Sequence, residues 1–145
     1  MRGTNHQPRI ATIAAALLAG VLAGGMGIAT AGEIEVHLSG KQEVPPVETA
    51  ASGHGVIKVE DDKSIRGSVK TSGIQGSGGH VHEAPVGKNG PDIITLKKTG
   101  DDEWSIPGGA TLTDAQYDAF KAGGLYINIH SDAHKGGEIR GQLKR

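Results

Sequence analysis

Leu125-Tyr126-Ile127-Asn128-Ile129-His130 is the stretch that says most about how this chain folds. Successive side chains of a β-strand point to opposite faces, so Ile127 and Ile129 share one face and the more polar side chains share the other. The aliphatic face predicts a strand that packs on a hydrophobic core. His130, at the end of the polar face, is expected to point away from the main hydrophobic layer or into a cavity at its edge.

Several other short segments also read as strands separated by turns. They alternate apolar and polar residues or are rich in β-branched residues, and they cover residues 33–38, 53–60, 65–70, 92–97 and 137–143. Asp61-Asp62-Lys63-Ser64 predicts a hairpin turn, and the four glycines within 73–79 predict a flexible approach to the next strand. Seven or eight short strands and one helix predict an all-β fold, an antiparallel β-sandwich with Greek-key connections.

The one short α-helix is expected from Asp114 to Lys121. Thr113 and Gln116 have the spacing of a capping box, in which each side chain accepts a hydrogen bond from the other residue's backbone N–H. The two glycines at 123–124 stop the helix. Its two aromatic side chains lie three residues apart and are expected to pack on the sheet.

A second strand carries the residues best suited to chemistry, Gly79-His80-Val81-His82. The two imidazoles project from the same face of a strand and can reach one point in space. If this strand lies against the one that ends in His130, three neutral imidazoles converge, which suits copper, zinc or nickel. His134, four residues after His130, and His54 are the candidates for a fourth ligand. The alternative is that these polar groups satisfy one another and bind nothing.

Glu138 and Arg140 share one face of the last predicted strand. They could form an exposed pair of charges that contributes little to stability. Arg140 could instead draw a small anion toward a metal ion, since its guanidinium is a permanent cation with directed donors. Glu138 could orient an imidazole by a hydrogen bond. The sequence leaves these readings open.

The first residues predict export. Arg2 and Arg9 precede an apolar run from Ile10 to Ile28, which ends in Ala29-Thr30-Ala31. A positive segment, an apolar segment and small residues at a cleavage site are typical of a secretory signal peptide, here residues 1–31. An uncleaved membrane anchor is the alternative. The prediction is a periplasmic or secreted domain, residues 32–145, that has no membrane attachment after cleavage.

Charge and composition exclude several functions for residues 32–145. Without Arg2 and Arg9, 13 of the 15 basic residues remain against 16 acidic ones, which is a formal charge of −3 and gives no nucleic-acid footprint. The chain contains no cysteine, so disulfides and thiolate chemistry are excluded. No serine stands in a Gly-x-Ser-x-Gly setting, and the scattered carboxylates do not indicate a glycosidase.

The order of short motifs resembles the CHRD domain, the module named after chordin and also found in single-domain exported bacterial proteins. The matching stretches are Leu38-Ser39-Gly40, Gln42-Glu43-Val44-Pro45-Pro46-Val47, His80-Val81-His82, Asn89-Gly90-Pro91, Leu112-Thr113, residues 123–130 and residues 136–143. The family usually has Ala where this chain has Gly79, and often Pro where it has Lys135. Neither difference affects a candidate ligand.

A weaker similarity concerns the histidines. His-Val-His on one strand, a later strand histidine and a carboxyl-terminal arginine resemble the copper half of Cu,Zn superoxide dismutases, which are also Greek-key sandwiches. The resemblance implies that His80, His82 and His130 are copper ligands, that Arg140 guides the anion, and that superoxide is the substrate. The disulfide pair and the histidine-rich zinc loop are missing from this sequence, so it implies a copper-only site.

The function expected from the sequence is an exported copper-binding CHRD domain with a mononuclear histidine site and dismutase-like activity. One alternative is a non-enzymatic module for extracellular interaction or for copper storage. Another is a structural zinc site, in which the ion stabilises the domain and no redox chemistry follows.

Overall fold

The computed structural model describes residues 32–145. The predicted signal peptide, residues 1–31, lies outside this range. Between residues 32 and 145 no helix has both the length and the apolar character needed to cross a membrane.

Within residues 32–145, nine strands form one antiparallel sheet, with one short α-helix and one 3-10 turn. In chain order the elements are β1 (Glu33–Ser39), η1 (Gly40–Gln42), β2 (Ser52–Val59), β3 (Ile65–Ser72), β4 (Gly76–Glu83), β5 (Asp92–Thr95), β6 (Lys97–Gly100), β7 (Glu103–Ser105), α1 (Asp114–Lys121), β8 (Leu125–Ser131) and β9 (Ile139–Leu143). The order across the sheet is β5-β4-β8-β9-β1-β2-β3-β7-β6. β3 and β4 are consecutive in the chain but do not pair, and the same is true of β7 and β8. The connections between them therefore cross to strands that lie far apart in the sheet. The predicted antiparallel β-sandwich with one short helix is confirmed.

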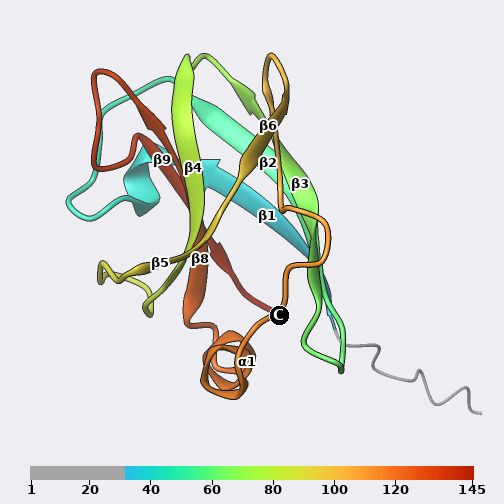
Figure 1. Cartoon of the computed structure of the whole chain (residues 1–145). Helices are drawn as coiled ribbons and strands as arrows, with labels where there is room; N and C mark the ends of the chain where they lie inside the picture. Colours follow the sequence, from blue (N-terminus) through green and yellow to red (C-terminus); the bar gives the residue numbers. More distant parts are fainter. Residues whose placement is uncertain (1–31) are drawn as a thin grey trace, which may run out of the picture.

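The two ends of the sheet are joined by a single residue. β5 and β6 are the outermost strands, yet only Leu96 separates them in the sequence. The Leu96 N–H donates a hydrogen bond of 2.9 Å to the carbonyl of Gly79, and its side chain is buried. The chain therefore runs directly from one end of the sheet to the other, and the sheet is nearly closed (Figure 1).

The core lies inside this closed sheet. Ile127 and Ile129 of β8 are fully buried, as the alternation of the strand predicts, and pack with Ile139 and Leu143 of β9. Each such side chain stabilises the fold by about 2 kcal/mol through burial of apolar surface. The other face of β8 is also covered, because Tyr126 is only 2 % exposed. The loops 40–47 and 84–91 lie over that face and create the setting of the candidate site.

The helix forms as its sequence predicts. α1 spans Asp114–Lys121, and both hydrogen bonds of the capping box between Thr113 and Gln116 are present. Phe120 of this helix is buried, and the centroid of its ring lies 6.2 Å from that of Tyr117. The helix closes one end of the sandwich (Figure 1).

The glycine-rich segment before the His-x-His motif is not a flexible approach. β4 begins at Gly76 and pairs with β8 through the glycines. A Cβ atom at Gly76 would lie 2.7 Å from the ring of Trp104, and one at Gly79 would lie 2.7 Å from Cδ1 of Ile129. These glycines therefore allow large side chains to pack closely over the strand.

Two predicted strand boundaries are wrong. Residues 92–97 form parts of two strands, because Leu96 is the point at which the chain changes from β5 to β6. The lysine-rich β6 and the three-residue β7 carry too little apolar alternation to be recognised in the sequence. The last strand begins at Ile139, since Gly137 adopts φ +126° within a turn closed by its N–H on the carbonyl of His134.

Candidate metal site

Antiparallel pairing of β4 with β8 places the three expected ligands on one face of the sheet. Gly78 stands opposite His130, His80 opposite Asn128, and His82 opposite Tyr126. Residues two apart on a strand share a face, so His80 and His82 flank the position toward which His130 projects. The prediction that both strands present compatible polar faces is confirmed.

The three imidazoles lie close enough to share one ion. One ring nitrogen from each of His80, His82 and His130 lies within 4.8 Å of the others. Nδ1 of His80 is 3.2 Å from Nε2 of His130, and the ring centroids are 5.1 to 6.4 Å apart. All three side chains are half-buried, which gives the cluster one side toward solvent.

Two of the rings are held by backbone carbonyls. Nδ1 of His82 lies 3.0 Å from the carbonyl oxygen of Gly90, and Nδ1 of His130 lies 2.7 Å from that of Lys135. A carbonyl oxygen only accepts, so each Nδ1 carries a proton and donates it. In a neutral ring the lone pair then lies on Nε2, and for His130 this atom faces His80. Metal-binding histidines are usually oriented by such a second hydrogen bond.

Asn128 contacts the third donor atom. Its Oδ1 is 2.9 Å from Nε2 of His82, and its Nδ2 donates at 3.4 Å to the carbonyl of Gly136. The Asn128 side chain is buried, so the amide has few other partners. The Asn128 amide therefore contacts the second nitrogen of the His82 ring, as the Gly90 carbonyl contacts the first.

The electrostatics keep His80 neutral. Burial, followed by the nearby positive forms of His130 and His82, holds the pKa of His80 below its usual value of 6.5. The lone pair that His80 needs for a metal therefore persists to lower pH than in a solvated histidine. A neutral three-imidazole cluster has the donor chemistry of a copper or zinc site.

Behind His82 lies a stack of planar groups. The rings of His82 and Tyr126 are parallel within 4°, with centroids 4.8 Å apart. The guanidinium carbon of Arg140 lies 3.4 Å from the Tyr126 ring. Because β8 lies between β4 and β9, Tyr126 separates Arg140 from His82. The hydroxyl of Tyr126 also accepts a hydrogen bond from the N–H of Gly90.

Arg140 is buried rather than part of an exposed pair. It is 1 % exposed and Glu138 is 9 % exposed, so the reading of two solvated surface charges is wrong. The guanidinium donates to the carbonyls of Lys88 and Pro85 and to Oε1 of Gln142, at 2.8 to 3.2 Å. The alternating pattern of residues 139–143 predicts an exposed polar face on this strand. Loop 84–91 covers that face of β9 and buries Arg140.

The remaining candidates lie outside the three-histidine cluster. His134 belongs to the turn after β8, where its backbone bonds to Ser131. His54 is exposed on β2, opposite His37 of β1. Within residues 32–145 the group that could hold an ion contains neither. Glu138 accepts a hydrogen bond of 2.7 Å from Thr49.

Glu43 is a buried carboxyl near the site that sequence reasoning did not single out. It is 5 % exposed, and its Oε1 has no hydrogen-bond partner. Burial raises the pKa of Glu43 to about 7, although the charge of Arg140 and a backbone bond from Val44 act in the opposite direction. The backbone carbonyls of Gly90 and Lys135 were also missed, because backbone acceptors leave no signal in a sequence.

The family model described as the CHRD domain matches residues 34–143. This chain belongs to the CHRD family. Neither the curated proteins nor the solved structures contain a match to it.

The motifs of this CHRD domain meet around the histidines. The loop of Glu43 and Val44 is tied to the loop of Asn89 by a 2.7 Å hydrogen bond from the Asn89 amide to the Val44 carbonyl. The backbone of Gly90 binds both His82 and Tyr126. Segments distant in the sequence thus support one site.

Proposed function

We propose that this CHRD domain binds one copper ion through His80, His82 and His130. The observation that carries the proposal is the convergence of one ring nitrogen from each of the three histidines within 4.8 Å, with the rings of His82 and His130 oriented through Nδ1 by backbone carbonyls. When bound, copper would supply a redox-active centre to the domain.

Copper is favoured over zinc by the donor set. In the general affinity order of divalent ions, copper binds nitrogen ligands more tightly than zinc. The cluster consists of three imidazoles, and no carboxylate or thiolate belongs to it in the part of the chain that the structure describes. Zinc is the competing ion and would act structurally.

The surroundings of Arg140 support copper binding without catalysis. An anion guide must present free donors toward the ion. Arg140 directs three N–H groups to Lys88, Pro85 and Gln142, and Tyr126 stands between it and His82. We therefore propose copper storage or delivery as the role, and dismutase-like activity guided by Arg140 as the second candidate, which rests on the resemblance of the histidine pattern.

Copper titration of protein expressed from the full chain tests the proposal. We expect one tight Cu(II) site, and we expect a His80→Ala/His82→Ala variant to weaken it by more than about 100-fold. The matched control is His37→Ala/His54→Ala, a pair that lies opposite on β1 and β2. A site unaffected by the first variant, or the absence of a stoichiometric site, contradicts the proposal.

Two further measurements separate the alternatives. Superoxide consumption no faster than that of the same concentration of free copper eliminates the dismutase candidate and leaves binding. Melting in excess zinc tests the structural alternative, since an ion at 100 times its Kd stabilises by about 2.7 kcal/mol. Greater stabilisation by zinc than by copper would favour a structural zinc site.

We also propose that the domain acts outside the cytoplasm, in the periplasm or after secretion. The support is the amino-terminal pattern of Arg2, Arg9, the apolar run and Ala29-Thr30-Ala31. Mass analysis of the protein in cell fractions tests it. Recovery of the uncleaved chain from the cytoplasm contradicts it.

A further inference from the structure

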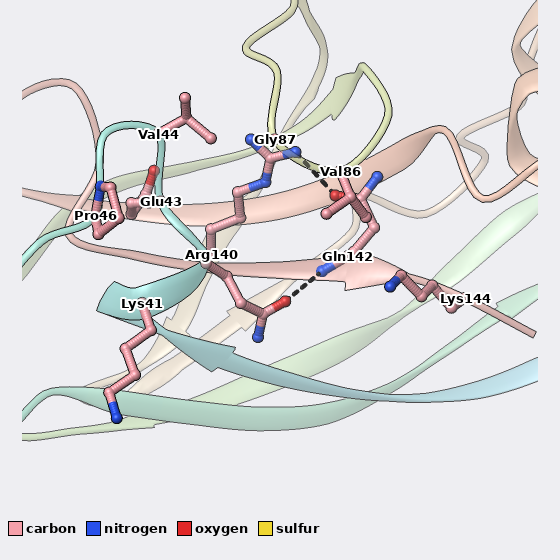
Figure 2. Close-up of a pocket in the computed structure, with 10 residues that line it drawn as sticks. Lys41, Glu43, Val44, Pro46, Val86, Gly87, Arg140, Gln142 and Lys144 are labelled. Atoms are coloured by element: carbon pink, nitrogen blue, oxygen red, sulfur yellow. Dashed lines mark hydrogen bonds between the residues drawn. The ribbon is translucent and has the colours of Figure 1, made fainter.

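A pocket of about 440 Å³ lies on the far side of the stack from the histidines. Its lining includes Lys41, Val44, Pro46, Val86, Arg140 and Lys144. Figure 2 shows Arg140 reaching between the loop that carries Glu43 and Val44 and the loop that carries Val86 and Gly87. The volume falls within the range of about 300 to 1,000 Å³ that is usual for small-molecule sites.

The walls of the pocket are fixed before any ligand binds. Gln42 donates from Nε2 to the carbonyl of His37 at 2.8 Å, and its Oε1 accepts from the N–H of Gln142 at 3.2 Å. Gln142 donates from its own Nε2 to the carbonyls of Ala84 and Gly123, both at 2.8 Å. These amides have their partners, so they shape the pocket without needing a ligand.

The charges around the pocket are mainly positive. Lys41 and Lys144 line it from exposed positions and form no salt bridge with a carboxylate of residues 32–145. The buried guanidinium of Arg140 adds a third positive charge. Burial raises the pKa of Glu43, the one carboxyl in the lining, to about 7, so its negative charge is only partly developed at pH 7. A domain with net negative charge thus presents a positive concavity here.

The remaining wall is apolar. It is formed by Val44 and Pro46 of loop 40–47 and by Val86 of loop 84–91. Val86 is 60 % exposed, which makes it one of the two large hydrophobic side chains left exposed between residues 32 and 145. An apolar wall opposite positive charges matches a molecule that has a compact apolar body and one anionic group.

We propose that this pocket binds a small organic carboxylate. The carboxylate lies in the combined positive potential of Lys41, Lys144 and Arg140, and the apolar body lies against Val44, Pro46 and Val86. The proposal does not depend on copper, because no histidine of the cluster lines the pocket.

Binding can be measured on metal-free protein expressed from the full chain, by amide chemical shifts during titration. The probes are acetate, hexanoate, benzoate and phenylacetate, with benzamide as the neutral analogue of benzoate and sulfate as an inorganic anion. We expect saturable shifts in residues 41–47, 84–88 and 140–144 with a carboxylate that has an apolar body. We expect benzamide and sulfate to bind at least tenfold more weakly.

Two variants test the assignment of the pocket. Lys41→Gln/Lys144→Gln should weaken carboxylate binding at least tenfold, whereas Lys70→Gln/Lys97→Gln, at two other exposed lysines, should leave it unchanged. Val86→Asp should weaken it through both lost apolar contact and repulsion, and the spectrum of each variant reports whether it folds. Absence of saturable binding by all four carboxylates up to 10 mM overturns the proposal. Equal affinity for sulfate, or binding unchanged in the first variant, also overturns it.

Discussion

Replacing Glu43 with glutamine should change how stability depends on pH. The folded protein holds the pKa of Glu43 at about 7, whereas the ordinary value is 4.5. Between these values the unfolded chain releases a proton that the folded protein keeps, so rising pH favours unfolding. The stability is complete below pH 4.5, is lost progressively as pH rises to about 7, and is constant above that.

The size of the effect follows from the same two values. Each unit of pKa difference corresponds to 1.36 kcal/mol. The carboxyl of Glu43 therefore costs the folded protein about 0.8 kcal/mol at pH 5 and about 3 kcal/mol at pH 8. Glutamine resembles the protonated acid in shape and cannot ionise. Glu43→Gln should therefore be more stable than the parent protein by about 3 kcal/mol at pH 8 and by only about 0.8 kcal/mol at pH 5.

Urea unfolding at pH 5, 6, 7 and 8 measures this difference. The quantity of interest is the free energy of unfolding of the variant minus that of the parent, because other groups that titrate cancel in it. Glu48→Gln is the matched control, since Glu48 is exposed five residues further along the same loop. A difference for Glu43→Gln that stays constant from pH 5 to pH 8 would refute the reasoning.

Three other predictions concern packing and protonation. Gly79→Ala should cost about 1 to 3 kcal/mol, because its Cβ would meet Cδ1 of the buried Ile129 at 2.7 Å. Gly55→Ala should prevent normal folding, since its Cβ would lie 2.0 Å from the backbone carbonyl oxygen of Ser68. Thermal melting of both variants compares them. Ile127→Ala should lower the free energy of unfolding by about 3 to 4 kcal/mol, because it leaves a cavity in the core. Val56→Ala, at a position that is 41 % exposed, should lower it by less than about 1 kcal/mol. Equal losses in the two variants would contradict this prediction. The ring of His80 should titrate below pH 6.5 in metal-free protein followed by NMR, and a midpoint above that value would show that burial does not govern it.

Strand alternation was enough to predict the centre of this fold. The stretch 125–130 identified the core face of β8, and the capping box placed α1 at its observed bounds. The same reasoning failed at β6 and β7, where exposed lysines and short length remove the periodic signal. Nothing local in the sequence indicates that Leu96 connects the two ends of the sheet.

The candidate ligands were predictable because His-x-His and His130 follow strand periodicity. The surroundings were not, because they arise from two loops folded over the polar face of the sheet. The burial of Arg140 depends on carbonyls of residues 85 and 88, and the orientation of His82 depends on the carbonyl of Gly90. The contacts of Arg140 join residues 52 and 55 positions apart, and a residue's type does not reveal which backbone will reach it.

The single-residue link at Leu96 also limits association between molecules. An exposed strand edge can template pairing with a second chain, and such pairing leads to aggregation. Here the two terminal strands, β5 and β6, have four residues each, and β6 carries Lys97 and Lys98. The link at Leu96 keeps both terminal strands short, and short length and lysines on an edge strand both disfavour pairing with another chain.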